Sequence, residues 1–356
     1  MKSIKILLLH KGYSSFVRAD YEILKKHFSV DLYFLNPSKK IHLFLYYHLR
    51  FFFYILFHVR KYDLIITWFG DYHAFNAGLL SKLFFIKHFI IVGGNDAVSI
   101  PEINYGVYAR KDLRSKLISI SYKLADAILC VDKSLIKGSN HYVDGENKVG
   151  LENFIPGISR KCFVVPTGYN SEKWSCNDEK KINQVLTVGV VDSERRAVLK
   201  GLDLIVRLAD KLPDVNFIFI GIDKNIVSDN YKEKKNLILL DKMAQEDLKK
   251  YYCSSKVYAQ FSLTEGLPNT LCEAMLCKCI AVGSNVNGIP TVIRDPEFIL
   301  NKKDVNKAKN IILKALKTDD TVGIKNRDYI KNNYAEEMRE KSFLQIIDTI
   351  FNKTKH

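Results

Sequence analysis

The sequence of 356 residues has no internal repeat and no low-complexity tract, which excludes solenoid and fibrous architectures. Residues 1–9 lack the long apolar region and the small-residue cleavage site of a signal peptide. Its seven cysteines show no zinc-ligand spacing, so we expect no metal site and reduced thiols, as in a cytosolic protein. They are Cys130, Cys162, Cys176, Cys253, Cys272, Cys277 and Cys279.

Negative charge is scarce in the first half of the chain. The formal net charge is +15, and most of the positive excess lies in residues 1–165. A surface of this sign favours phosphates, acidic lipid head groups or nucleic acid. The sequence contains no recognised basic and aromatic nucleic-acid module, so we expect no nucleic-acid partner.

The most unusual segment, residues 39–61, is aromatic and basic, and no acidic residue occurs from Leu32 through Tyr62. A transmembrane helix needs about 20 mostly apolar residues, and His48 and Arg50 at the centre argue against one. Two interpretations fit. The segment is either a helix on the surface of an anionic membrane or a crossover helix buried against a sheet.

Strand and helix patterns alternate along the whole chain, which is typical of parallel α/β sheets. The first half contains strands at residues 4–9, 30–35, 63–68 and 88–92. The second half contains strands at residues 184–189, 216–221, 257–261 and 280–283. We therefore expect an α/β fold with four parts. These are a first domain at 1–165, a linker at 166–183, a second domain at 184–334 and a C-terminal helix at 335–356 that packs back on the first domain.

The second half is organised around the segment from Val257 to Leu276. A buried strand ends near Phe261, a short loop follows, and a helix runs over residues 269–276. Free N–H groups and the positive dipole end of such a helix suit a phosphate, and Gly266 allows close approach. Glu265 and Glu273 flank this anion site. Carboxylates do not bind phosphate, so we expect them to bind hydroxyl groups, and the arrangement fits a nucleotide-sugar.

The sequence Glu-Gly-Leu-Pro-Asn-Thr-Leu-Cys-Glu-Ala-Met at 265–275, followed by Asn-Gly-Ile-Pro at 287–290, resembles the donor-site signature of retaining glycosyltransferases of the GT-B fold, family four type. The resemblance implies two Rossmann-like domains with parallel sheets facing each other across a cleft. It also implies a metal-independent enzyme that uses a nucleotide-sugar as co-substrate, with no cofactor.

By the same resemblance, Glu265 takes the donor sugar, Glu273 the ribose hydroxyls and Lys200 the phosphates. The family usually has an arginine directly after Val188-Gly189, where this chain has Val190. Other residues implied on the donor side are Gly266, Leu267, Pro268, Asn269, Thr270, Arg195, Arg196, Lys242 and Met243. Of these, the two arginines replace the missing cation, and the loop of Lys242 and Met243 meets the nucleobase.

Candidate acceptor residues lie at predicted strand ends of the first domain, where ligands of open α/β sheets bind. They are Gly12, Asp71, His73, Gly94 and Asp96. We expect the acceptor to be a saccharide or a lipid-linked saccharide of cell-surface polysaccharide or glycolipid synthesis. The protein would then be cytoplasmic, with peripheral contact to an anionic membrane at the inner face of the plasma membrane.

Several alternatives remain open from the sequence. The chain could be a non-catalytic nucleotide-sugar-binding subunit, or a nucleotide-sugar epimerase of related fold. Retention could proceed by front-face transfer, in which the leaving phosphate helps to deprotonate the acceptor, or through a covalent glycosyl intermediate.

Overall fold

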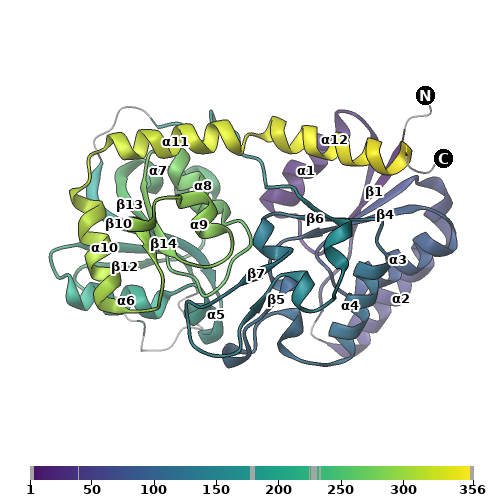
Figure 1. Ribbon diagram of the computed structural model, residues 1–356, viewed down its shortest axis with the longest axis horizontal. Helices are drawn as coiled ribbons and strands as arrows, with labels where there is room; N and C mark the ends of the chain where they lie inside the picture. Colours follow the sequence, from purple (N-terminus) through teal and green to yellow (C-terminus); the bar gives the residue numbers. More distant parts are fainter. Residues whose placement is uncertain are drawn as a thin grey trace. The chain divides into compact units, whose positions relative to one another are not determined.

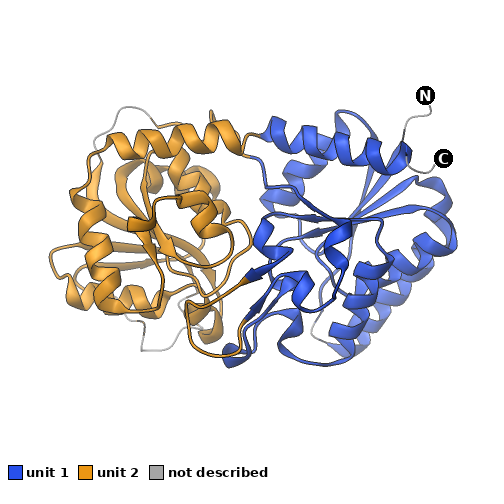
Figure 2. Ribbon diagram, viewed as in Figure 1, with its two compact units in different colours: residues 1–138, 148–168, 336–356 blue, residues 139–147, 169–335 orange. Residues whose placement is uncertain are grey.

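The computed structural model describes residues 4–38, 40–176, 181–223, 225, 231 and 234–352. The chain forms two compact units, shown in different colours in Figure 2. Unit 1 comprises Met1–Gly138, Lys148–Gly168 and Glu336–His356, and unit 2 comprises Ser139–Asn147 and Tyr169–Ala335. Residues 177–180 of the expected linker and 353–356 of the expected C-terminal helix lie outside the described residues.

A parallel sheet of six strands, in the order β2-β1-β3-β4-β6-β9, forms the centre of unit 1 (Figure 1). Every residue of the third strand in the chain is buried, as expected for a parallel sheet covered by helices on both faces. The strands are β1 (Lys5–His10), β2 (Ser29–Phe34), β3 (Leu64–Trp68), β4 (Lys87–Val92), β6 (Ala127–Cys130) and β9 (Cys162–Val164). The helices are α1 (Ser15–Lys25), α2 (Ile41–His58), α3 (Tyr72–Leu83), α4 (Leu113–Leu124) and α12 (Glu336–Asn352).

Helix α12 belongs to unit 1 although it follows unit 2 in the chain. Arg339 on this helix forms a fully buried ion pair with Asp20 of α1, with Nε–Oδ1 at 2.5 Å and Nη2–Oδ2 at 2.7 Å. Trp68 donates its indole N–H to the same carboxylate at 2.9 Å. This pair fixes the last helix to the first because a buried charge is tolerated only with its partner in place.

Unit 2 also contains a six-stranded parallel sheet, in the order β12-β11-β10-β13-β14-β15. Its strands are β10 (Ile182–Val191), β11 (Asn216–Ile222), β12 (Leu237–Leu240), β13 (Ser255–Gln260), β14 (Ile280–Ser284) and β15 (Ile299–Leu300). Its helices are α5 (Glu194–Leu199), α6 (Leu202–Lys211), α7 (Gln245–Ser254), α8 (Asn269–Leu276), α9 (Gly288–Ile293), α10 (Val305–Lys317) and α11 (Thr321–Asn333). The predicted α/β class with two parallel sheets is therefore confirmed.

The segment Ser139–Asn147 lies within the first half of the sequence but packs with unit 2. The Asn140 side-chain amide donates to the Leu263 carbonyl at 2.7 Å, and the Lys303 N–H donates to the Tyr142 carbonyl at 2.9 Å. A third, small sheet has the order β5-β8-β7, with β5 at Val98–Ser99, β7 at Gly138–Ser139 and β8 at Lys148–Val149.

Helix α2 combines features of both interpretations of residues 39–61, of which Lys39 lies outside the described residues. Phe51 and Ile55 are fully buried in a core with Leu7 and Ile65 of the sheet. The opposite side of the helix exposes large apolar side chains to solvent. Among the described helices, none is long and apolar enough to cross a membrane.

The expectation that all cysteines are reduced is wrong for two of them. Cys176 and Cys253, 77 residues apart, form a disulfide within unit 2. Cys277 lies beside this disulfide, with its sulfur within 4.8 Å of both others. No pairing of this kind could be predicted from the irregular spacing of the cysteines. The five free cysteines are Cys130, Cys162, Cys272, Cys277 and Cys279.

Candidate functional site

The candidate donor site of unit 2 lies where β13 passes into α8. The helix begins at Asn269, as predicted, and Pro268 precedes it as the N-cap residue in an extended conformation. Gly266 and Leu267 are buried in the connecting loop, whereas Glu265 is half-buried. Within the described part of the chain, no hydrogen bond is found from the backbone N–H of Gly266 or Leu267. These two donors and the helix N-terminus are available to an anion.

Lys200 meets Glu265 at this junction because two loops approach each other closely. Gly201, with φ +75°, forms the start of α6, and a Cβ at this position would lie 2.4 Å from the Phe261 carbonyl oxygen. Only glycine permits this approach. It brings the Lys200 Nζ to 2.6 Å from the Glu265 Oε1.

Three donors converge on the same oxygen of Glu265. Besides Lys200, the Ser262 hydroxyl donates to Oε1 at 2.7 Å and the Gln260 amide at 3.1 Å. For the second oxygen, Oε2, no hydrogen bond to any described residue is found. The carboxylate is thus held by one oxygen and can offer the other to a hydroxyl group.

The Asn-Gly-Ile-Pro segment holds the Glu265 loop from the other side. Asn287 Oδ1 accepts from the Thr264 hydroxyl at 2.9 Å and from the Glu265 N–H at 3.4 Å. The Gly288 N–H donates to the Gly266 carbonyl at 3.1 Å. The Asn287 Nδ2 is buried and finds no partner among the described residues, so it remains a donor beside the site.

Glu273 lies inside α8 and is 5% exposed. Its Oε2 accepts from the Tyr252 hydroxyl at 3.2 Å and its Oε1 from the Gln245 amide at 3.3 Å. Burial raises the pKa of Glu273 to about 8, against the opposing effects of these two hydrogen bonds and the charge of Lys173. At neutral pH the carboxyl is therefore mostly protonated.

The first turn of α8 carries the next two predicted residues, both half-buried. Thr270 donates to the Gln260 side chain at 3.3 Å and also lies 3.5 Å from the Val188 carbonyl at the end of β10. Asn269 accepts from the Tyr169 hydroxyl at 2.7 Å. These contacts fix the helix start against the neighbouring strand and the chain that enters the unit.

The remaining predicted donor residues lie on surrounding loops and a short helix. Arg195 and Arg196 are on α5, a helix of six residues where the sequence indicated a loop. Arg196 is engaged with the Asp192 carboxylate at 3.0 Å. Lys242 is exposed and Met243 half-buried in the loop between β12 and α7.

In unit 1, Asp71 is the centre of a charged cluster at the carboxyl end of the sheet. It caps α3 by accepting from the Tyr72 N–H at 3.0 Å, and Arg114 donates to both of its oxygens at 2.9 Å. Lys11, from the loop after β1, forms an ion pair with the same carboxylate. Although burial raises it, the pKa of Asp71 is held below its usual range by the charges of Lys11 and Arg114. Two cations on one carboxylate leave a net positive cluster.

The other predicted acceptor residues differ in exposure. Gly12 has open space around its α-carbon. His73 is buried and hydrogen-bonds the Trp68 carbonyl at 3.2 Å, and burial lowers its pKa to about 3, so it is neutral.

Asp96 is buried at the ends of β3 and β4. It accepts from the N–H groups of Gly70 at 2.8 Å and Gly94 at 3.0 Å, and from the Tyr122 hydroxyl at 3.0 Å. These hydrogen bonds give Asp96 and Gly94 a structural role in joining two loops.

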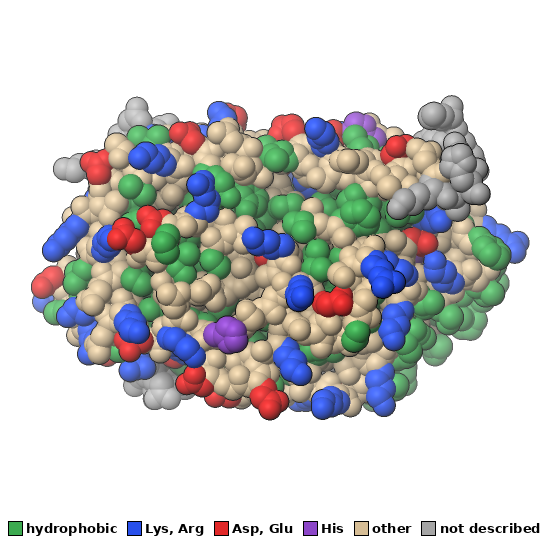
Figure 3. All heavy atoms as spheres, viewed as in Figure 1, with side chains coloured by type: hydrophobic (Ala, Val, Ile, Leu, Met, Phe, Trp, Pro, Cys, Tyr) green, Lys and Arg blue, Asp and Glu red, His purple; other side chains and the backbone are tan. Residues whose placement is uncertain are grey.

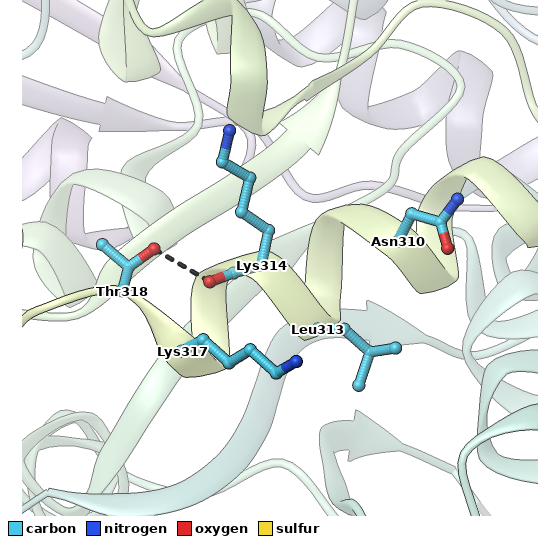
Figure 4. Close-up of a pocket in the computed structure, with 5 residues that line it drawn as sticks. All are labelled: Asn310, Leu313, Lys314, Lys317 and Thr318. Atoms are coloured by element: carbon cyan, nitrogen blue, oxygen red, sulfur yellow. Dashed lines mark hydrogen bonds between the residues drawn. The ribbon is translucent and has the colours of Figure 1, made fainter.

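A hollow of about 450 Å³ on the surface of α10 lies apart from these residues (Figure 4). Its lining comes from one helix end, with Lys314 and Lys317 extending in different directions and Thr318 closing the last turn on the Lys314 carbonyl at 2.8 Å. It contains none of the residues that the sequence singled out.

Sequence reasoning missed the residues that orient the two glutamates. Gln260 and Ser262 stand within five residues of Glu265, so the local strand pattern could have identified them. Lys11 follows the first strand, and its charge next to a predicted cleft loop was a usable signal. Tyr252 and Arg114 lie on other elements, and nothing in the sequence links them to their partners.

Comparisons with known proteins identify the class of this chain. Residues 171–336 match the family model described as glycosyl transferases group 1. The yeast (Saccharomyces cerevisiae) phosphatidylinositol N-acetylglucosaminyltransferase GPI3 subunit is 26% identical over 243 residues, 60% of this chain and 51% of the relative. The corresponding human (Homo sapiens) transferase protein is 27% identical over 213 residues, 57% of this chain and 41% of the relative. The chain thus spans about half the length of the curated relatives it matches.

A third relative is the alpha-galactosylglucosyldiacylglycerol synthase of Streptococcus pneumoniae, 27% identical over 154 residues, 37% of this chain and 40% of the relative. Among solved structures, sucrose-phosphate synthase from Thermosynechococcus elongatus superposes with a TM-score of 0.73 at 13% identity, covering 98% of this chain and 100% of its own. Anabaena HepE in complex with UDP and glucose gives 0.73 at 12% identity, covering 97% and 100%. Together with the two parallel sheets and the Glu265 to Glu273 motif, these findings show that the chain is a glycosyltransferase of the GT-B fold with a glycosyl transferases group 1 domain.

Proposed function

We propose that this protein transfers a glycosyl group from a nucleotide-diphosphate donor to a saccharide or lipid-linked saccharide, with retention at the anomeric carbon and without a metal ion. The observation that carries the proposal is the 2.6 Å contact between Lys200 and Glu265 at the N-terminus of α8. It puts a cation, two backbone donors and a carboxylate within one short junction of unit 2.

Departure of a nucleoside diphosphate requires positive charge at its oxygens. Lys200, the N–H groups of Gly266 and Leu267 and the dipole of α8 are suited to supply it. Lys200 would then exchange part of its contact with Glu265 for a phosphate oxygen. The second oxygen of Glu265 would accept from a hydroxyl of the donor sugar, and Glu273 would accept from the ribose.

Uridine diphosphate is the nucleotide with the strongest support, because Anabaena HepE binds UDP and shares the fold. A lipid acceptor is supported by the relatives, which are named for transfer to phosphatidylinositol and for synthesis of a glycosylated diacylglycerol. The cluster of Lys11, Arg114 and Asp71, with its net positive charge, suits an acceptor that carries a phosphate. We place the protein on the cytoplasmic side of a membrane, as a peripheral protein.

Front-face transfer is favoured over a covalent intermediate by the environment of Glu265. Three donors, one of them a cation, bind the oxygen Oε1 and stabilise the carboxylate. A carboxylate stabilised in this way is a weak nucleophile, whereas its charge can still support positive charge at the anomeric carbon. Glu265 then orients and stabilises, and the leaving phosphate accepts the acceptor proton.

The test is a panel of nucleotide-sugars, with binding measured by calorimetry and slow hydrolysis by chromatography. We expect one uridine diphosphate sugar to bind and to be hydrolysed by the wild-type protein. Glu265→Gln should bind it and lose hydrolysis, while Glu297→Gln, a surface change on unit 2, should leave both unchanged. Binding without turnover by the wild type, with or without a lipid-linked acceptor, would instead support a non-catalytic subunit, which is how the yeast relative is named.

A further inference from the structure

Five large apolar side chains form a continuous stripe on the outer side of α2. Ile41, Leu45, Leu49, Phe53 and Phe57 recur every four residues, so they lie on one side of the helix. Their exposed fractions are 69%, 52%, 57%, 50% and 75%. We call this stripe the apolar ridge. Isolated apolar side chains on a surface are ordinary, whereas a continuous row along an 18-residue helix marks an interaction surface.

The end of α3 adds another exposed aromatic side chain beside this helix. Phe44 of α2 contacts Tyr72 at the start of α3, and Arg60 after α2 lies 5.1 Å from the ring of Phe84 at its end. The two helices therefore run alongside each other in the same direction. Phe85 follows, 93% exposed and with φ +59°, a backbone conformation that costs a bulky residue energy. The chain holds a strained backbone at a residue whose side chain gains no burial in the protein.

The surroundings of the apolar ridge carry positive charge. Lys40, Arg50, Arg60 and Lys61 are exposed along and beside α2. The nearest acidic side chains are Asp31 and Asp63, beyond the stretch from Leu32 through Tyr62 that contains none. Figure 3 shows hydrophobic side chains gathered over the part of unit 1 where α2 and α3 lie, with Lys and Arg side chains beside them.

This charge selects the occupant of the surface. In a symmetric dimer of this chain the same patch would contact itself, so the four cations would face four cations. A bilayer with anionic lipids offers apolar chains to the ridge and phosphates to the basic fringe at the same time. The ridge also projects from a convex helix, which suits insertion between lipid head groups.

We propose that α2 docks in the plane of an anionic phospholipid bilayer, with the apolar ridge and Phe85 inserted at the boundary of head groups and acyl chains. The basic residues Lys40, Arg50, Arg60 and Lys61 then contact lipid phosphates. Phe51 and Ile55 keep their places in the core of unit 1, so docking requires no unfolding. The position of the protein on the bilayer is independent of the reaction; only its use, the presentation of a lipid-linked acceptor to Asp71, rests on the proposed function.

The experiment is sedimentation with phosphatidylcholine vesicles that contain either no phosphatidylglycerol or about a third of it, without donor or acceptor. The ridge variant is Leu49→Gln/Phe53→Gln/Phe57→Gln. The control is Ile182→Gln/Ile238→Gln/Ile324→Gln, three apolar residues of unit 2 with similar exposed fractions of 53%, 48% and 47%. A third variant, Arg50→Gln/Arg60→Gln/Lys61→Gln, removes charge alone.

We expect the wild type and the control to bind the anionic vesicles, and the ridge variant to lose about tenfold or more in partition coefficient. The charge variant should lose its preference for anionic over neutral vesicles. Phe85→Gly removes the exposed ring and relieves the strained backbone, so it should fold at least as well as the wild type and still bind less tightly. This variant keeps the test decisive even where the triple variant fails to fold.

Equal vesicle binding by the wild type, the ridge variant and Phe85→Gly would overturn the proposal. So would a wild-type dimer in sedimentation velocity that the ridge variant abolishes, because the surface would then belong to a second copy. Donor hydrolysis, measured without vesicles, should be the same in the wild type and the ridge variant. Loss of vesicle binding therefore cannot be confused with failure of the proposed reaction.

Discussion

Replacement of Glu273 by glutamine should change how the stability of the protein depends on pH. Glutamine keeps the size of the side chain and can hydrogen-bond both Tyr252 and Gln245, but it does not titrate. In the folded wild type, burial raises the pKa of Glu273 to about 8, compared with 4.5 for the free side chain. The folded state thus binds a proton that the unfolded state releases between these two values.

The magnitude follows from this difference in pKa. A displacement of about 3.5 units corresponds to about 5 kcal/mol between the two protonation states. Because the folded pKa is raised, the contribution is fully present below pH 4.5 and is lost as the pH rises through 8. Between pH 5.5 and 7.5 the wild type should lose about 2.7 kcal/mol of unfolding free energy relative to Glu273→Gln, from the slope of about 1.4 kcal/mol per pH unit.

The assay is denaturant unfolding at pH 5.5, 6.5 and 7.5, followed by the fluorescence of Trp174, which packs on Tyr252 with ring centroids 5.6 Å apart. The exposed Glu297→Gln serves as the control and should run parallel to the wild type. Parallel curves for Glu273→Gln and the wild type would refute the reasoning, because the carboxyl would then titrate normally in the folded protein. Donor binding offers a second measurement. A ribose hydroxyl that donates to Glu273 favours its ionised form, so nucleotide binding at pH 7 should release a proton, detectable by calorimetry in buffers of different ionisation enthalpy.

Three further changes test other parts of the structure. Lys200→Met should lower the turnover number about 10²- to 10³-fold, with a smaller effect on donor KM, because it removes charge from the departing diphosphate; equal turnover would contradict this role. Reduction of the disulfide between Cys176 and Cys253, or Cys253→Ser, should lower the stability of unit 2 by up to about 4 kcal/mol, as expected for a loop closed over 77 residues, measured by thermal unfolding with and without reductant. Arg339→Met leaves the buried Asp20 carboxylate without its partner and should cost about 3–5 kcal/mol in unfolding free energy, whereas the double variant Arg339→Met/Asp20→Asn should recover part of it.

Local sequence rules predicted the elements around Glu265 well. The helix expected at 269–276 has those bounds, because Pro268 and the polar loop before it define its start. The strand expected at 257–261 runs over Ser255–Gln260, a shift of the usual size for an element boundary. The resemblance of the motif predicted the two parallel sheets of the fold, which short-range patterns alone do not specify.

The parts that could not be predicted depend on contacts between distant residues. The high pKa of Glu273 arises from burial beneath α7, which begins 28 residues earlier in the sequence. Helix α5 has only six residues, too few for a hydrophobic period to appear, so its segment was assigned to a loop. In α2, Phe51 and Phe53 look alike in sequence, yet one is fully buried and the other half exposed. A deletion of Phe51 to Phe53 would therefore damage the core together with the outer surface.

The central claim is that unit 2 grips an activated saccharide by its diphosphate and its hydroxyl groups through one loop and one helix. A crystal structure with a bound uridine diphosphate sugar tests it most directly. The account predicts phosphate oxygens against Lys200 and the N–H groups of Gly266 and Leu267, with the ribose on Glu273 and the sugar on Glu265. A nucleotide bound elsewhere, or bound here with both carboxyl groups turned away from it, would contradict the account.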